Sequence, residues 1–107
     1  MLCLGVALTG AVAHAACSYP RAPQDLPDGN TATTEQMLTA QNAVKEYVAA
    51  IEQYLDCLDA EVAALGDAAS EERILMRDKR HNAAIDAMDK TASEFNQAVR
   101  QYKARDN

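Results

Sequence analysis

Apolar residues recur at intervals of three and four over residues 34–65, the spacing of one face of an α-helix. The recurring positions are Met37, Ala40, Val44, Tyr47, Ile51, Tyr54, Leu58 and Leu65, with Val48, Leu55 and Val62 beside them. A second stripe of mostly smaller residues follows Ala40, Ala43, Tyr47, Ala50, Tyr54, Cys57 and Ala64. Thr33 and Gln36 fit a capping box at the start, and Gly66 fits the position after the end. We therefore predict one long helix whose apolar face is wide enough for two neighbours.

A second helix is predicted over residues 70–103. Its apolar positions are Ile74, His81, Ile85, Met88, Ala92, Phe95, Val99 and Tyr102. Ser70 suits its N-cap, with Asp67 as an alternative, because both side chains can accept a backbone hydrogen bond. The short connection forces an antiparallel pair, in which the numbers of facing residues sum to about 136. The predicted fold class is all-α, an antiparallel two-helix hairpin of the coiled-coil kind.

Residues 16–33 predict an extended segment, because they contain all three prolines of the chain. Pro27-Asp28-Gly29 predicts a turn in which glycine accepts a positive φ. Cys17 and Cys57 predict one disulfide in an oxidising compartment. An extended chain from Cys17 can run antiparallel along the first helix and lie on the small-residue stripe. We call this segment the strap. Closing its loop stabilises the fold by about 4 kcal/mol in the chain-entropy account.

Residues 1–15 predict a signal peptide. Residues 2–13 are apolar and uncharged, and Ala13-His14-Ala15 has the small-x-small pattern of a cleavage site. The basic start of such a signal is missing, since no Lys or Arg precedes Arg21. Cleavage there gives a periplasmic or secreted protein with a strap (16–33) and a hairpin domain (34–107). In a rival prediction Cys17 carries a lipid anchor, which leaves Cys57 as a free thiol.

The formal net charge is −6, and no basic arm offsets it. Such a chain is a poor nucleic-acid binder, because phosphate neutralisation supplies most of that affinity. No apolar run after the predicted signal approaches membrane-spanning length. Another copy or another protein is the expected partner, bound through the apolar face of the first helix.

His81 is the candidate for metal or small-ligand chemistry, with Asp78 three residues before it on the same helix face. The pair is a weak candidate, because one histidine with scattered carboxylates does not make a transition-metal site. A Cys57–His81 thiol dyad needs a free Cys57, which the predicted disulfide removes. We predict no cofactor, no catalytic residues and no enzymatic activity.

Several motifs together resemble a group of small, functionally uncharacterised exported proteins of proteobacteria. The matching motifs are Cys17-x-Tyr19-Pro20, Leu26-Pro27-Asp28-Gly29-x-Thr31-Ala32, Tyr54-Leu55-x-Cys57 and His81-Asn82-Ala83-Ala84. The resemblance covers nearly the whole predicted mature chain. It implies a periplasmic helical hairpin and no particular activity. We therefore expect a non-enzymatic interaction or stress-related module that acts through its surface.

Overall fold

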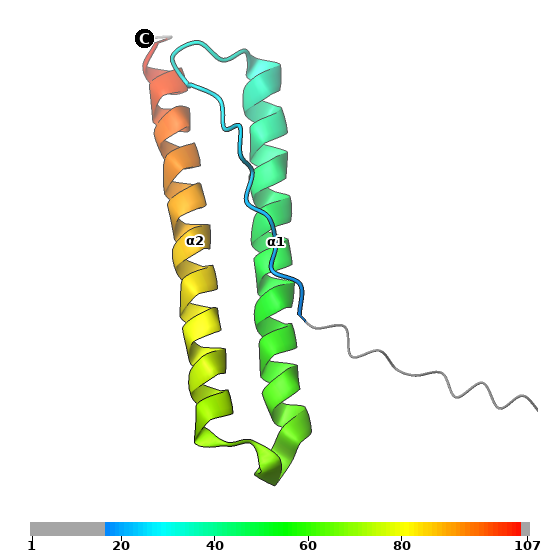
Figure 1. Ribbon diagram of the computed structural model, residues 1–107. Helices are drawn as coiled ribbons and strands as arrows, with labels where there is room; N and C mark the ends of the chain where they lie inside the picture. Colours follow the sequence, from blue (N-terminus) through cyan, green and yellow to red (C-terminus); the bar gives the residue numbers. More distant parts are fainter. Residues whose placement is uncertain (1–16, 106–107) are drawn as a thin grey trace, which may run out of the picture.

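The computed structural model describes residues 17–105. It contains helix α1 (Thr34–Leu65), the short 3₁₀ turn η1 (Gly66–Ala68) and helix α2 (Glu71–Ala104), with no strand in the described range. The two helices lie antiparallel, side by side, and the strap runs along them (Figure 1). The all-α hairpin is therefore confirmed. The predicted signal peptide, Ala16 and the last two residues lie outside the described range.

Side-chain caps at the predicted residues begin both helices. The Thr33 hydroxyl accepts a hydrogen bond from the Gln36 amide at 3.1 Å, and the Gln36 side chain accepts one from the Thr33 amide at 2.9 Å. The Ser70 hydroxyl accepts one from the Arg73 amide at 3.1 Å, so Ser70 is the cap rather than Asp67. Gly66 follows α1 with a φ of 51°, a conformation that favours glycine.

The strap is fixed to α1 by the predicted disulfide between Cys17 and Cys57, whose Cα atoms are 5.7 Å apart. It was predicted to lie on the stripe of α1, and Tyr19 does contact Tyr54 there; the packing of its second half against α2 was not predicted. Gly29 is buried, and a Cβ atom there would lie 2.9 Å from the Cβ of Gln101 and closer still to the carbonyl of Ala98. Arg105 donates to the Gly29 carbonyl at 3.1 Å. The strap is therefore a third layer that contacts both helices.

A turn follows Asp28, as predicted, but the reason given for its glycine was wrong. The Asp28 carbonyl accepts hydrogen bonds from Thr31 and Ala32, and its carboxylate accepts one from Asn30. The φ angle of Gly29 is not positive, since Gly66 is the only positive-φ residue of the described chain. Gly29 is needed because the backbone approaches α2 too closely for a side chain.

The core follows the predicted stripe on α1 and departs from it on α2. Seven predicted positions of α1, Met37 to Leu58, are buried, and only Leu65 of that set is not. On α2 the buried residues are Ala84, Thr91 and Ala98, none of which was in the predicted stripe. Ile74 was predicted to be in the core and is 37% exposed. The buried face of α2 is therefore rotated toward small residues, where the strap and α1 come close.

The predicted pairing register is correct. Arg77 forms an ion pair with Asp59, and the hydroxyls of Thr34 and Tyr102 are hydrogen-bonded; the numbers in each pair sum to 136. Of the helices in the described range, neither is long and apolar enough to cross a membrane.

Candidate functional site

Several contacts join the start of the strap to the hairpin. The Tyr19 ring meets the Tyr54 ring edge-on, with 5.3 Å between centroids, and the Arg80 guanidinium lies 5.8 Å from the Tyr54 centroid on α1. The Cys17 amide donates to the Glu61 carboxylate at 3.4 Å. Ring and cation–π contacts of this kind add to the stability that burial provides. This cluster fixes the strap to the hairpin.

The disulfide decides between the thiol-based alternatives. The sulfur of Cys17 is bonded to that of Cys57, so it is not available for the thioether linkage of a lipid anchor. The same bond leaves Cys57 without the thiolate that a Cys57–His81 dyad needs. Both alternatives require a protein in which the bond between Cys17 and Cys57 is absent.

Three candidate metal-ligand atoms come together at Cys17, Cys57 and Glu61, all within 4.8 Å of one another, and nowhere else in the described chain. Two of them are the bonded sulfurs, which are not thiolates, and metals are bound by thiolates. The Glu61 carboxylate also lies 3.7 Å from the Arg80 guanidinium. In the oxidised protein these residues are therefore part of the anchor of the strap.

His81 and Asp78 line an open surface pocket together with Asp59, Arg77 and Asn82. Arg77 donates to Asp78 at 2.8 Å and to Asp59 at 3.0 Å. These bonds, the one to Asp78 first, raise the pKa of Arg77 above its ordinary value. A cation beside His81 would have to compete with this guanidinium for both carboxylates.

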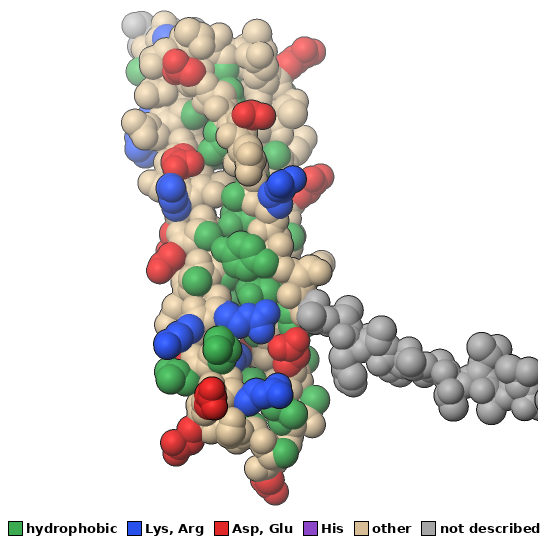
Figure 2. Space-filling model, in the orientation of Figure 1, with side chains coloured by type: hydrophobic (Ala, Val, Ile, Leu, Met, Phe, Trp, Pro, Cys, Tyr) green, Lys and Arg blue, Asp and Glu red, His purple; other side chains and the backbone are tan. Residues whose placement is uncertain are grey.

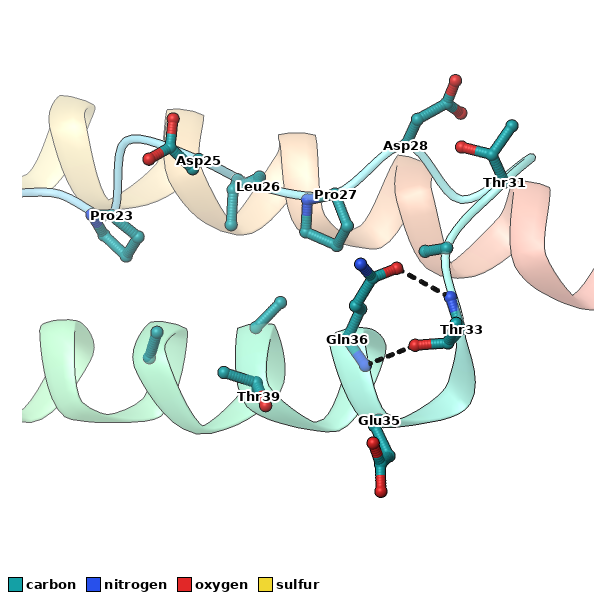
Figure 3. Close-up of a pocket in the computed structure, with 13 residues that line it drawn as sticks. Pro23, Asp25, Leu26, Pro27, Asp28, Thr31, Thr33, Glu35, Gln36 and Thr39 are labelled. Atoms are coloured by element: carbon teal, nitrogen blue, oxygen red, sulfur yellow. Dashed lines mark hydrogen bonds between the residues drawn. The ribbon is translucent and has the colours of Figure 1, made fainter.

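A larger hollow of about 790 Å³ lies between the strap and the start of α1. Leu26 and Pro27 project toward α1, while the carboxylates of Asp25, Asp28 and Glu35 point away from the space between them (Figure 3). Since these carboxylates do not converge, they do not form a cation site. The hollow is open to solvent and is bordered by the capping box of Thr33 and Gln36. It is therefore a depression of the surface beside the strap, not an enclosed site.

A groove at the opposite end of the hairpin was not foreseen from the sequence. We call it the loop-end groove; it has a volume of about 400 Å³. Its lining residues are Leu58, Glu61, Val62, Leu65, Ser70, Glu72, Arg73, Met76, Arg77 and Arg80. Hydrophobic and basic side chains lie at this end of the visible face, with acidic side chains among them (Figure 2). The spacing of the arginines at 73, 77 and 80, beside Met76, is the sequence pattern that indicates such a face.

Exposed apolar side chains adjoin this groove. Leu75 and Met76 are each 54% exposed, and Ile74 is 37% exposed. The described strap begins at Cys17, opposite Cys57, and runs from there toward the start of α1 (Figure 1). It therefore covers α1 up to about Cys57 and does not continue along the loop end. Among residues 17–105, no strap segment packs over the place where these side chains are exposed.

Comparison of the chain with protein-family models, curated proteins and solved structures finds no match. The fold and its disulfide define the class of protein: a two-helix hairpin strapped by its own N-terminal segment.

Proposed function

We propose that this chain is a non-enzymatic, exported binding module that acts through the loop end of its hairpin. The single observation that carries the proposal is the exposure of Met76 in the lining of the open groove, with the exposed Ile74 and Leu75 directly before it on α2. Contiguous apolar surface at a groove is typical of a binding site, whereas singly scattered apolar residues are normal. On α1 the strap and α2 bury the predicted stripe from Met37 to Leu58, whereas Leu38 outside this stripe is 54% exposed.

The location of the binding surface differs from the one expected on α1. The apolar face of α1 is the stripe that was expected to take another copy or a protein partner. Tyr47, Ile51 and Tyr54 in this stripe are buried within the molecule itself. Two further apolar positions of α1, Val62 and Leu65, line the loop-end groove. We therefore move the proposed contact to this end.

Export to the periplasm or out of the cell is part of the proposal. The disulfide supports it, because such bonds persist mainly in oxidising compartments. The apolar start of the sequence with its Ala13-His14-Ala15 pattern supports it as well. The resemblance to small exported proteobacterial proteins agrees with this compartment. The intact mass of the protein recovered from an exporting host tests this. We expect the mass of a chain that begins near Ala16, and the mass of the uncleaved chain would contradict export by this route.

Binding of the neutral dye Nile red tests the location of the surface. The double variant Leu75→Gln/Met76→Gln is expected to lose most of the fluorescence increase that the native protein produces, because the variant replaces exposed apolar side chains with polar ones. Leu38→Gln is the matched control, since Leu38 is also 54% exposed but lies in the first turns of α1. It is expected to leave the fluorescence unchanged. Equal losses in both variants, or no binding by the native protein, would contradict the proposal.

A further inference from the structure

We infer that the loop-end groove binds a single-chain anionic amphiphile, a molecule with one alkyl chain and a carboxylate head. This inference rests on the proposed function and names the chemistry of the ligand. The groove combines an apolar floor with a rim of three arginines and two glutamates, Glu61 and Glu72, in a protein whose net charge is −6. A volume of about 400 Å³ lies within the usual range for small-molecule sites.

The floor of the groove is built by both helices. Leu58 is almost fully buried, and Val62 and Leu65 continue its row one and two turns further along α1. Met76 borders the groove from α2 and is half exposed. Its unbranched thioether side chain adapts to apolar ligands of irregular shape. This surface suits an alkyl chain lying between the helices, in the place that the strap occupies further along.

Arg73 is the proposed contact for the carboxylate head. Arg77 is bonded to Asp59 and Asp78, and Arg80 faces Glu61 and the Tyr54 ring. Arg73 forms no ion pair with any residue of the described chain. A guanidinium matches a carboxylate in a bidentate geometry, so Arg73 can bind the head without breaking an existing pair.

Two other occupants fit the groove less well. A second copy related by two-fold symmetry would bring its own Arg73, Arg77 and Arg80 to the same surface, and like charges in contact disfavour association. An anionic bilayer would meet Asp67, Glu71 and Glu72, three acids at the tip of the hairpin. A single amphiphile meets fewer of these charges: Glu61 and Glu72 line the groove, but Glu61 faces Arg80 and the head needs only Arg73.

Calorimetric titration of the oxidised protein with decanoate, below its aggregation concentration, tests the inference. We expect saturable one-to-one binding. Arg73→Gln is expected to weaken it by up to about fivefold, the effect of losing one exposed ion pair. Neutral 1-decanol is expected to bind weaker than decanoate by a similar factor. Arg100→Gln, an exposed arginine near the other end of α2, is the matched control and is expected to change nothing.

Each alternative result overturns the inference. These are no saturable heat, equal affinity for decanoate and decanol, or equal effects of the Arg73 and Arg100 substitutions. Sedimentation with phosphatidylglycerol vesicles without decanoate binding would assign the surface to a bilayer instead. A dimer that dissociates on Leu75→Gln/Met76→Gln would assign it to a second copy. If Nile red still binds at the loop end, these results reject the ligand class and leave the proposed function standing.

Discussion

Tyr47 lies where the two helices and the strap pack together. Its ring is buried between α1, α2 and the strap, and its hydroxyl has no hydrogen-bond partner of good geometry within the described chain. Burial raises the pKa of Tyr47, the nearby Tyr19 raises it further, and the Thr91 hydroxyl partly offsets this. A buried hydroxyl without a good partner costs stability.

Replacing Tyr47 by phenylalanine is expected to leave stability at neutral pH unchanged or about 1 kcal/mol higher. The pKa of Tyr47 is raised in the folded protein. The stability linked to this pKa shift is therefore fully present below the ordinary tyrosine pKa of about 10. It is lost as the pH rises through the pKa of Tyr47 in the folded protein. Urea unfolding followed by circular dichroism, near pH 7 and above pH 10, measures the difference.

The Tyr47→Phe variant is expected to lose less stability above pH 10 than the native protein. Tyr19→Phe is the control, because Tyr19 is 55% exposed, and it is expected to keep most of the alkaline loss. If Tyr47→Phe and the native protein lose the same stability above pH 10, the buried phenol is not the group responsible.

At the scale of elements, the sequence predicted α1 better than α2. The stripe from Met37 to Leu58 contains large apolar residues, and these are buried because α2 and the strap cover them from two sides. On α2 the buried positions are Ala84, Thr91 and Ala98. Small residues produce a weak hydrophobic pattern in the sequence. They are nevertheless needed where two backbones approach closely, because larger side chains do not fit there. Hydrophobic periodicity alone therefore favoured Ile74, which is exposed.

The site was less predictable than the fold. The disulfide, both caps and the register followed from residue types and chain length. The loop-end groove depends on where the strap stops, which is a property of three segments together. The contact of the strap with α2 was not predicted for the same reason, because the close approach of Gly29 to Ala98 has no signature in the sequence.

The contact between the strap and α2 makes Gly29 sensitive to any side chain. Gly29→Ala is expected to lower the free energy of unfolding by about 1–3 kcal/mol, because the added Cβ overlaps the Ala98 carbonyl on a fixed helix backbone. Urea unfolding measures the loss. Gly66→Ala is the comparison: its Cβ meets no atom within 4 Å, and it costs about 1 kcal/mol through its positive φ. A smaller loss for Gly29→Ala than for Gly66→Ala would contradict the close packing of the strap.

At the scale of the whole molecule, two helices have too little surface to enclose a core alone. The strap completes the core over Tyr47, Ile51 and Tyr54, and the disulfide holds the strap there. A bond that closes a loop across 40 residues stabilises such a fold by about 4 kcal/mol in the chain-entropy account. The described part of the strap does not cover the loop end, and this is why we place the binding surface there.

Trypsin cleavage after Arg21 tests the central role of the disulfide most directly. Arg21 is the only lysine or arginine in the strap, and Ala22 beside it packs against the core cluster. Cleavage needs the strap to detach, and the disulfide opposes this. Mass spectrometry after reduction gives the rate for the oxidised native protein and for Cys17→Ser/Cys57→Ser. We predict cleavage at least about tenfold faster in the variant, with helicity largely retained. Equal rates would contradict the account.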